Sequence, residues 1–110
     1  MTKKLETQTH TENVLSFIVK FARPHIFEGK EYTEIDLSGL DDLTAEDLSY
    51  CEGMFAQMKQ ADPMKEFNTT FCLLVAQRAT NLPFEFFSTL KISNATRIKA
   101  TVSGFLFESA

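Results

Sequence analysis

The stretch "EIDLSGLDDLTAEDL", residues 34–48, contains six acidic side chains and marks a change in the periodicity of the chain. Before it, apolar residues alternate with polar ones, and after it they recur every three or four positions. Alternation is typical of a strand, and the longer spacing is typical of a helix. We therefore expect these acids to end a strand and begin a helix.

The second half of this stretch has the chemistry of a helix start. Thr44 is a suitable N-cap, and Asp47, three residues later, completes a capping box. Glu46 and Asp47 lie in the first turn, where the helix dipole favours negative charge. A helix is predicted over residues 44–60, with an apolar stripe of Leu48, Cys51, Phe55 and Met58 facing a core.

The residues before the stretch predict a β-hairpin over residues 13–38. Gly29, in the sequence Phe27-Glu28-Gly29-Lys30, is suited to a tight turn, and Pro24 restricts the first strand to an edge or a bend. Leu15, Phe17, Val19 and Phe21 share one face of the first strand. In the second strand, Thr33, Ile35 and Leu37 share one face, and Tyr32, Glu34 and Asp36 share the other. Two strands are marginal alone, so the hairpin must pack on helices or pair with another chain.

Three more helices are predicted, over residues 67–80, 83–90 and 94–108. The first is apolar almost all round between residues 71 and 76, and Asn81 suits the left-handed residue that ends it. Pro83 is expected as the first residue of the next helix, and Ser93 as the cap of the last. The predicted fold is α+β and mostly α: a flexible tail at 1–12, then one domain at 13–110 with a hairpin and a compact bundle of three to four helices.

Charge is unevenly distributed over the 110 residues, whose net charge is −4. Residues 31–62 carry nine acids and one base, a charge of −8, whereas the segments on either side each carry five bases and three acids. An acidic middle argues against nucleic acid as a partner, because phosphate binding needs a basic stripe. It suits a solvated surface, a basic protein partner, or the opposite end of a second copy.

No cofactor, metal or catalytic site is expected. A calcium loop starting at Asp36 would have Leu40 where an oxygen ligand is required. A catalytic pair of Asp41 and Asp42 is the alternative to their role in the loop and helix entry, and no hydrolase, nucleotide-binding or metalloprotease motif accompanies it. We therefore predict that the protein is not an enzyme.

The two cysteines and the hydropathy pattern predict where the protein works. Cys51 and Cys72 lie in apolar patterns without metal-binding spacing, which favours buried free thiols in the reducing cytoplasm; a disulfide between them is the alternative. The longest apolar run, residues 71–76, is too short to cross a bilayer, and the N-terminal residues are not a secretion signal. No membrane association is predicted.

Aromatic side chains supply the candidate partner-binding residues. Eleven of the 13 aromatic residues are Phe, which either fill a core or form an apolar surface. The candidates are Phe84, Phe86, Phe87, Leu90, Phe105 and Phe107. Phe84, Phe87 and Leu90 share one face of the helix over 83–90, which leaves Phe86 turned away. The helix over 94–108 has an apolar stripe of Ala95, Ile98, Val102 and Phe105, with Leu106 beside it, and Phe107 points elsewhere. We therefore expect Phe86 and Phe107 to be at least partly exposed.

The order and spacing of two longer stretches resemble a known family. "FEGKEYTEIDLSGLDDLTAEDL" (27–48) and "ATNLPFEFFSTLKISNATRIKATVSGFLF" (79–107) are similar to the tail assembly chaperones of long-tailed bacteriophages. The resemblance covers residues 15–107 and rests on an F-x-G-K-x-Y hairpin, an L-x-x-L-x-x-L-T-x-x-D-L helix entry and a helix that ends before Leu-Pro. The chain departs from the family at Asn81, where Gly is usual, and at Gly104, where a polar residue is common.

The resemblance implies a non-enzymatic assembly factor in the host cell cytoplasm. Its partner would be the tape measure protein, with the tail tube protein as a second partner, and it would be absent from the finished virion. The alternatives are a structural subunit or adaptor retained in the particle, and a small regulatory binding domain, for which the acidic middle disfavours nucleic acid as the ligand. We also expect weak self-association, because the hairpin has an open edge and its acidic middle is complementary to the basic ends of another copy.

Overall fold

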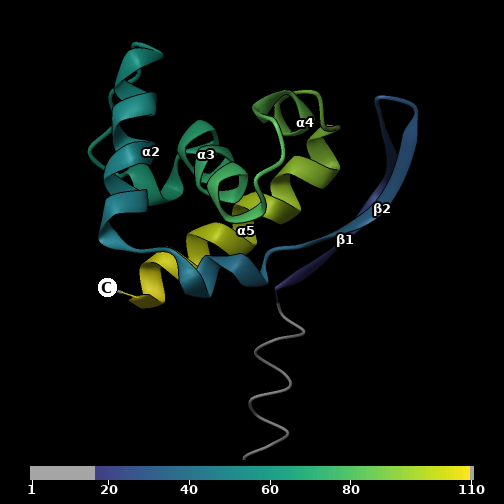
Figure 1. The fold of residues 1–110 in the computed structure, drawn as a ribbon, viewed down its shortest axis with the longest axis horizontal. Helices are drawn as coiled ribbons and strands as arrows, with labels where there is room; N and C mark the ends of the chain where they lie inside the picture. The colour runs from purple at the N-terminus through teal and green to yellow at the C-terminus, as the bar shows by residue number, and fades with distance from the viewer. Residues whose placement is uncertain (1–16, 110) are drawn as a thin grey trace, which may run out of the picture.

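The structure is a computed structural model that describes residues 17–109, in which a β-hairpin precedes a set of helices (Figure 1). The predicted fold class, α+β and mostly α, is confirmed. The predicted tail at 1–12 and the start of the hairpin at 13–16 lie outside the described residues. The elements are β1 (Ile18–Phe27), β2 (Lys30–Asp36), the 3-10 helix η1 (Ser38–Asp42), α2 (Ala45–Gln57), the 3-10 helix η2 (Lys65–Phe67), α3 (Thr69–Thr80), α4 (Phe84–Ser88) and α5 (Ile92–Ser109).

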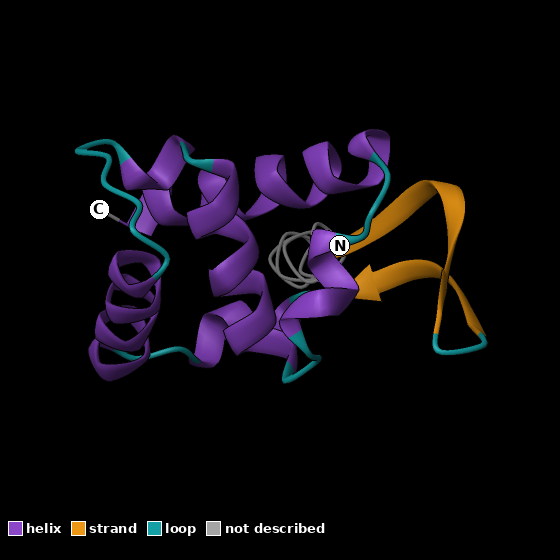
Figure 2. Ribbon diagram, turned by 90° about the horizontal axis from the view of Figure 1, so that it is seen from above, coloured by secondary structure: helices purple, strands orange, loops and turns teal. Residues whose placement is uncertain are grey.

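Strands β1 and β2 are antiparallel and extend from one side of the helices (Figure 2). Phe27 pairs with Lys30, which leaves Glu28 and Gly29 as the turn, with φ values of 51° and 79°. Two successive positive φ values are typical of a type I′ turn, whose twist matches that of the strands. Gly29 adopts this conformation without steric cost, so the turn predicted from the sequence is confirmed.

The pairing of the strands is irregular in its middle. The register changes between Lys20 and His25, so that residues 21–24 lie opposite Thr33 alone. Along β2 the inward direction therefore changes: Ile35 is buried, Tyr32 is half-buried and Thr33 is exposed. The sequence prediction had Thr33 inside and Tyr32 outside, and it was wrong at both positions because strict alternation does not allow for a bulge.

Asn94 of α5 holds the irregular part of β1, which includes Pro24. Its Oδ1 accepts hydrogen bonds from the backbone N–H of Ala22 (2.9 Å) and of Arg23 (3.3 Å). Its Nδ2 donates to the carbonyl of Arg23 at 2.7 Å, and the side chain is fully buried. Backbone groups that leave a β-ladder need other partners, and Asn94 supplies them. Arg97 adds a bond to the carbonyl of Lys20 at 3.1 Å.

The distal half of the hairpin covers Phe86 of α4. His25 is buried, and its Nε2 lies 3.0 Å from the carbonyl oxygen of Phe86. The Phe86 ring packs edge-to-face against His25, Phe27 and Tyr32, at centroid distances of 4.7, 5.4 and 4.8 Å. The prediction that Phe86 is at least partly exposed was therefore wrong, because the hairpin covers its ring and the side chain is fully buried.

Helix α2 begins as predicted and ends earlier than predicted. Thr44 is its N-cap, and a complete capping box joins Thr44 to Asp47. The helix ends at Gln57 rather than at residue 60. Lys59, with a φ of 62°, donates its N–H to the carbonyl of Ala56 at 2.9 Å. A residue with positive φ interrupts the helical backbone, which accounts for the earlier end.

The predicted apolar stripe of α2 is buried only at its centre. Cys51 and Phe55 are about 1% exposed, whereas Leu48 and Met58 are 40% and 36% exposed. Helices α2 and α5 both pack on α3 and make few contacts with each other. The outer positions of the stripe therefore have no helix to cover them among the described residues.

Helix α3 is the centre of the core. Its side chains from Phe71 to Ala76 are all buried, as the sequence predicted. Asn68 caps its start by accepting from the N–H of Phe71 at 3.1 Å, and residues 65–67 form a separate 3-10 turn instead of belonging to the helix. Asn81, with a φ of 62°, ends the helix in the predicted left-handed conformation.

Gly39 allows η1 to lie directly against the last turn of α3. A Cβ atom at this position would lie 2.4 Å from the carbonyl oxygen of Ala79. Leu37 and Leu40, on either side of Gly39, are completely buried. The Ser-Gly step in the acidic stretch therefore does more than end a strand, because the absence of a side chain permits close backbone contact.

The starts of α4 and α5 differ from the predictions. Pro83 is the N-cap of α4 rather than its first residue, and the helix is shorter than the predicted 83–90. Helix α5 begins at Ile92, so Ser93 is inside the helix and is not its cap. The N–H groups of Asn94 and Ala95 already donate to the carbonyl of Lys91, at 3.0 and 2.9 Å. The predicted stripe of α5 is confirmed at Ile98 and Val102, both fully buried.

Candidate functional site

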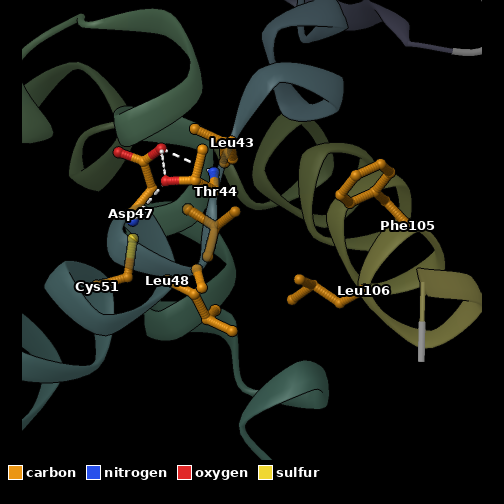
Figure 3. A pocket seen from close by; sticks show the side chains of 9 residues that line it. Leu43, Thr44, Asp47, Leu48, Cys51, Phe105 and Leu106 are labelled. Atoms are coloured by element: carbon orange, nitrogen blue, oxygen red, sulfur yellow. Dashed lines mark hydrogen bonds between the residues drawn. The ribbon is translucent and has the colours of Figure 1, made fainter.

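An open pocket lies between the start of α2 and the last turns of α5 (Figure 3). Its volume is about 210 Å³. Leu48 and Cys51 of α2 form one side, and Phe105 and Leu106 of α5 form the other (Figure 3). Leu43, Thr44, Ala45, Asp47 and Val75 complete the lining.

The capping box fixes the α2 side of the pocket. The backbone N–H of Thr44 donates to Asp47 Oδ2 at 2.9 Å, and the Asp47 N–H donates to Thr44 Oγ1 at 3.4 Å. The Thr44 hydroxyl also donates to Asp47 Oδ2 at 3.1 Å. These bonds set the direction in which α2 begins, and with it the positions of the apolar residues on either side of the cap.

Arg78 of α3 ties the same capping residue to the core. Its Nε donates to Asp47 Oδ1 at 2.8 Å, and its guanidinium group lies 4.1 Å from the ring centroid of Tyr50. The hydrogen bond from the Thr44 N–H, followed by that from Arg78, lowers the pKa of Asp47. Asp47 is therefore an ionised structural carboxylate with all of its close partners already in the protein.

The chemistry of the lining suits an apolar side chain better than a reaction. Burial raises the pKa of the Cys51 thiol to about 11, so this group is protonated near neutral pH and is not a nucleophile. A volume of 210 Å³ is below the roughly 300–1,000 Å³ of ordinary small-molecule sites. The pocket has room for one or two large apolar side chains of a partner.

Exposed apolar residues adjoin the lining residues in the sequence or pack on those that do. Leu48, at its edge, is 40% exposed, and Phe107, one residue beyond Leu106, is 64% exposed. The ring of Phe107 lies 6.1 Å from that of Phe67, which is itself 47% exposed. Aromatic side chains left in water in this way are common where a partner binds.

The six residues predicted to bind a partner fall into two separate groups. Phe105 lines the pocket and Phe107 lies exposed at the same end of α5, as predicted for Phe107. Phe86 and Phe87 are fully buried, and Phe84 and Leu90 are half-buried and pack against the core. The α4 residues therefore belong to the core beneath the hairpin, and only the α5 residues lie at the candidate site.

Sequence reasoning missed most of the pocket. The sequence predicts Leu48 in the stripe that faces the core, Leu43 as a hydrophobic staple onto Leu48, and Leu106 beside the stripe of the last helix. Residues 43–48 and 105–106 are far apart in the sequence and line the same pocket only because α2 and α5 both pack on α3. The sequence signal available was the apolar character of residues on both sides of the capping box.

Of the six acids in residues 34–48, only Asp47 lines the pocket. Asp41, Asp42 and Glu46 are exposed, and Asp47 is held in the capping box. Within residues 17–109, no three His, Cys, Asp or Glu side chains gather as a metal site would require. Cys51 and Cys72 are both free and buried, as favoured from the sequence.

Comparison with known proteins identifies no relative of the chain. No family model, no curated protein and no solved structure matches the chain. Among the described helices, none combines the length and the apolar character needed to cross a membrane.

Proposed function

We propose that the protein is a bacteriophage tail assembly chaperone without enzymatic activity, working in the host cell cytoplasm. It would bind amphipathic helices of the tape measure protein and keep them soluble until the tail tube polymerises around them. The observation that carries the proposal is the open apolar pocket between α2 and α5, with Phe107 exposed beside it. Such a groove suits the apolar face of a partner helix.

The positions of the family-like motifs in the structure support the proposal. The F-x-G-K-x-Y motif surrounds the hairpin turn, and the L-T-x-x-D-L motif is the capping box that forms one wall of the pocket. Asn81, where the family usually has Gly, has the positive φ that Gly would adopt. Each motif therefore has a structural role that a related sequence would need to keep.

Weak self-association is part of the same proposal. In the described sheet, β2 pairs with β1 on one side and has no strand on its other side. An unpaired edge can add a strand from a second copy. Glu31, Glu34 and Asp36 are exposed on this strand, and like charges in a symmetric pair would keep the association weak.

Co-purification with the tape measure protein tests the proposal. We expect a tagged chain to retain fragments of the tape measure protein encoded beside it. Ala45→Phe, which places a ring at the pocket, should remove most of this binding. Ala100→Phe is the matched control, because Ala100 is an exposed residue of α5 that does not line the pocket. Equal retention by both variants, or none by the unmodified chain, contradicts the proposal.

Mass spectrometry of purified particles separates the chaperone from its main alternative. A chaperone is absent from finished particles, whereas a structural subunit or adaptor is retained in them. Detection of the chain in stoichiometric amounts in finished particles would replace the proposal with that alternative.

A further inference from the structure

We propose that the α2–α5 pocket selects a positively charged amphipathic helix and takes one of its apolar side chains. This inference deepens the proposed function, on which it rests for the use of this surface, by assigning the chemistry of the partner. It depends on three observations: an apolar pocket of limited size, a rim of uncompensated acids, and a helix C-terminus at the same place.

The α2 side of the pocket is acidic. Residues 41–52 contain five acids and no base. Three of these acids, Asp41, Asp42 and Glu46, are exposed and lie within two positions of a lining residue in the sequence. Among the described residues, none that lines the pocket is Lys, Arg or His. A cation brought to this rim by a partner would therefore meet several carboxylates and no repelling charge from the lining.

The nearby cation of the protein is already engaged. Arg78 bonds Asp47 at 2.8 Å and stacks over Tyr50, which neutralises one of the five acids. Lys59 is the first base after Lys30, so the whole segment between them has none. The remaining acids are left to solvent, and a basic partner supplies the charge that the chain lacks here.

The α5 side is also favourable to cations. The last turn of α5 contains no basic side chain, and Lys99 is the last base before the lining residues Phe105 and Leu106. A helix C-terminus carries partial negative charge on its last carbonyl groups, which favours a neighbouring cation. The α5 wall therefore favours a cation, and on the α2 wall the acids Glu46 and Asp47 offset the partial positive charge of the helix N-terminus.

The shape of the site favours a helix as the occupant. The walls are two helices that pack on α3 and leave a cleft between them, with Leu48 and Phe107 exposed beside it. A partner helix with apolar residues at i, i+3, i+4 and i+7 can place one in the pocket and another on these flanking residues. A second copy of the chain is a poorer occupant, because each segment that flanks its acidic middle carries five bases but also three acids.

Two designed peptides test the charge selection. Both have about 18 residues, so that helix formation is possible, with Leu at helical spacing; one has Lys and the other Glu at all remaining positions. Fluorescence anisotropy measures their binding to the full chain at about 50 mM and about 500 mM salt. We expect the Lys peptide to bind at least about tenfold more tightly than the Glu peptide, and its affinity to fall with salt.

Variants of the protein locate the effect. The triple variant Asp41→Asn, Asp42→Asn and Glu46→Gln should lower the affinity for the Lys peptide by about five- to tenfold at the lower salt concentration. Its control, Glu28→Gln, Glu31→Gln and Glu85→Gln, removes the same charge from exposed positions on the hairpin and α4 and should change binding by about twofold at most. Ala45→Phe should abolish binding of the Lys peptide.

The outcomes distinguish this inference from the proposed function. Equal binding of both peptides at the pocket overturns the charge selection and leaves the chaperone proposal standing. Binding of the Lys peptide that Ala45→Phe does not reduce shows attraction without docking, which overturns the inference. If Ala45→Phe removes self-association in sedimentation and leaves peptide binding unchanged, the occupant is a second copy, and the inference is wrong. Selective binding of the Lys peptide without any capture of tape measure protein refutes the proposed function alone.

Discussion

Replacing Asn94 by Ala is expected to detach the hairpin from α5 and to destabilise the whole domain. The side chain is fully buried and makes three hydrogen bonds to β1, of 2.9, 3.3 and 2.7 Å. At about 1 kcal/mol net for each, the bonds would contribute about 3 kcal/mol. The 3.3 Å bond is weaker than the others, and the backbone of Ala22 and Arg23 can reach water once the side chain is removed.

We therefore expect Asn94→Ala to lower the free energy of unfolding by about 2–3 kcal/mol. This corresponds to a roughly 30- to 150-fold change in the ratio of folded to unfolded protein. Urea denaturation followed by circular dichroism measures the change directly. Thr96→Ala is the control on the same helix, because Thr96 is exposed, and it should change stability by less than about 0.5 kcal/mol.

Asn94→Asp separates hydrogen bonding from loss of volume. The carboxylate keeps the two acceptor bonds but faces the carbonyl of Arg23, to which the amide had donated. The free energy of unfolding of Asn94→Asp should therefore be lower than that of the unmodified protein. This difference should become smaller as pH falls, because a protonated carboxyl group can donate to that carbonyl again. A loss below about 0.5 kcal/mol for Asn94→Ala, or a deficit for Asn94→Asp that is the same at every pH, would refute this reasoning.

Three other perturbations follow from the packing and the thiols. Phe86→Ala should lower the free energy of unfolding, measured in urea, by about 3–5 kcal/mol. Phe107→Ala, at a 64% exposed position, should lower it by less than about 0.5 kcal/mol. Similar losses for the two variants would mean that the hairpin does not cover α4. Gly39→Ala should lower stability by about 1–3 kcal/mol, because the added Cβ meets the backbone of α3, and an unchanged melting temperature would contradict that contact. Burial raises the pKa of both Cys51 and Cys72 from 9.0 to about 11, so the unfolded state loses these protons first and stability should fall as pH rises from 9 to 11. The double variant Cys51→Ala and Cys72→Ala should show a smaller fall over that pH range, and an identical slope would exclude the thiols as its cause.

The elements with local signals were predictable from the sequence. The capping box at Thr44, the left-handed residue at Asn81 and the turn at Gly29 each depend on a few adjacent residues, and all three were confirmed. The buried centre of α3 was likewise visible as a continuous apolar run. Errors began where one segment determines the environment of another, because periodicity in one segment carries no information about what packs on it.

Phe86 and Asn94 show this limit most clearly. The spacing of α4 predicts that Phe86 points away from the core, whereas His25, Phe27 and Tyr32 of the hairpin pack on its ring. Asn94 is a polar residue in a helical pattern, and its partners are 71 and 72 residues away in the sequence. The pocket is a similar case. Whether its lining residues are buried or exposed depends on how α2 and α5 pack on α3, which neither segment shows by itself.

The hydrogen bonds of Asn94 also have a consequence for the order of folding during synthesis. The hairpin emerges from the ribosome first, yet the side chain that fastens it is 71 residues beyond Arg23. At about 5–20 residues per second, the hairpin waits roughly 4–14 s for that partner. An isolated two-stranded hairpin is marginal in water, so β1 and β2 remain open to wrong pairing throughout this interval. Completion of the fold therefore depends on a contact between residues that are far apart in the sequence. Folding should for this reason be slow for a chain that is mostly helical.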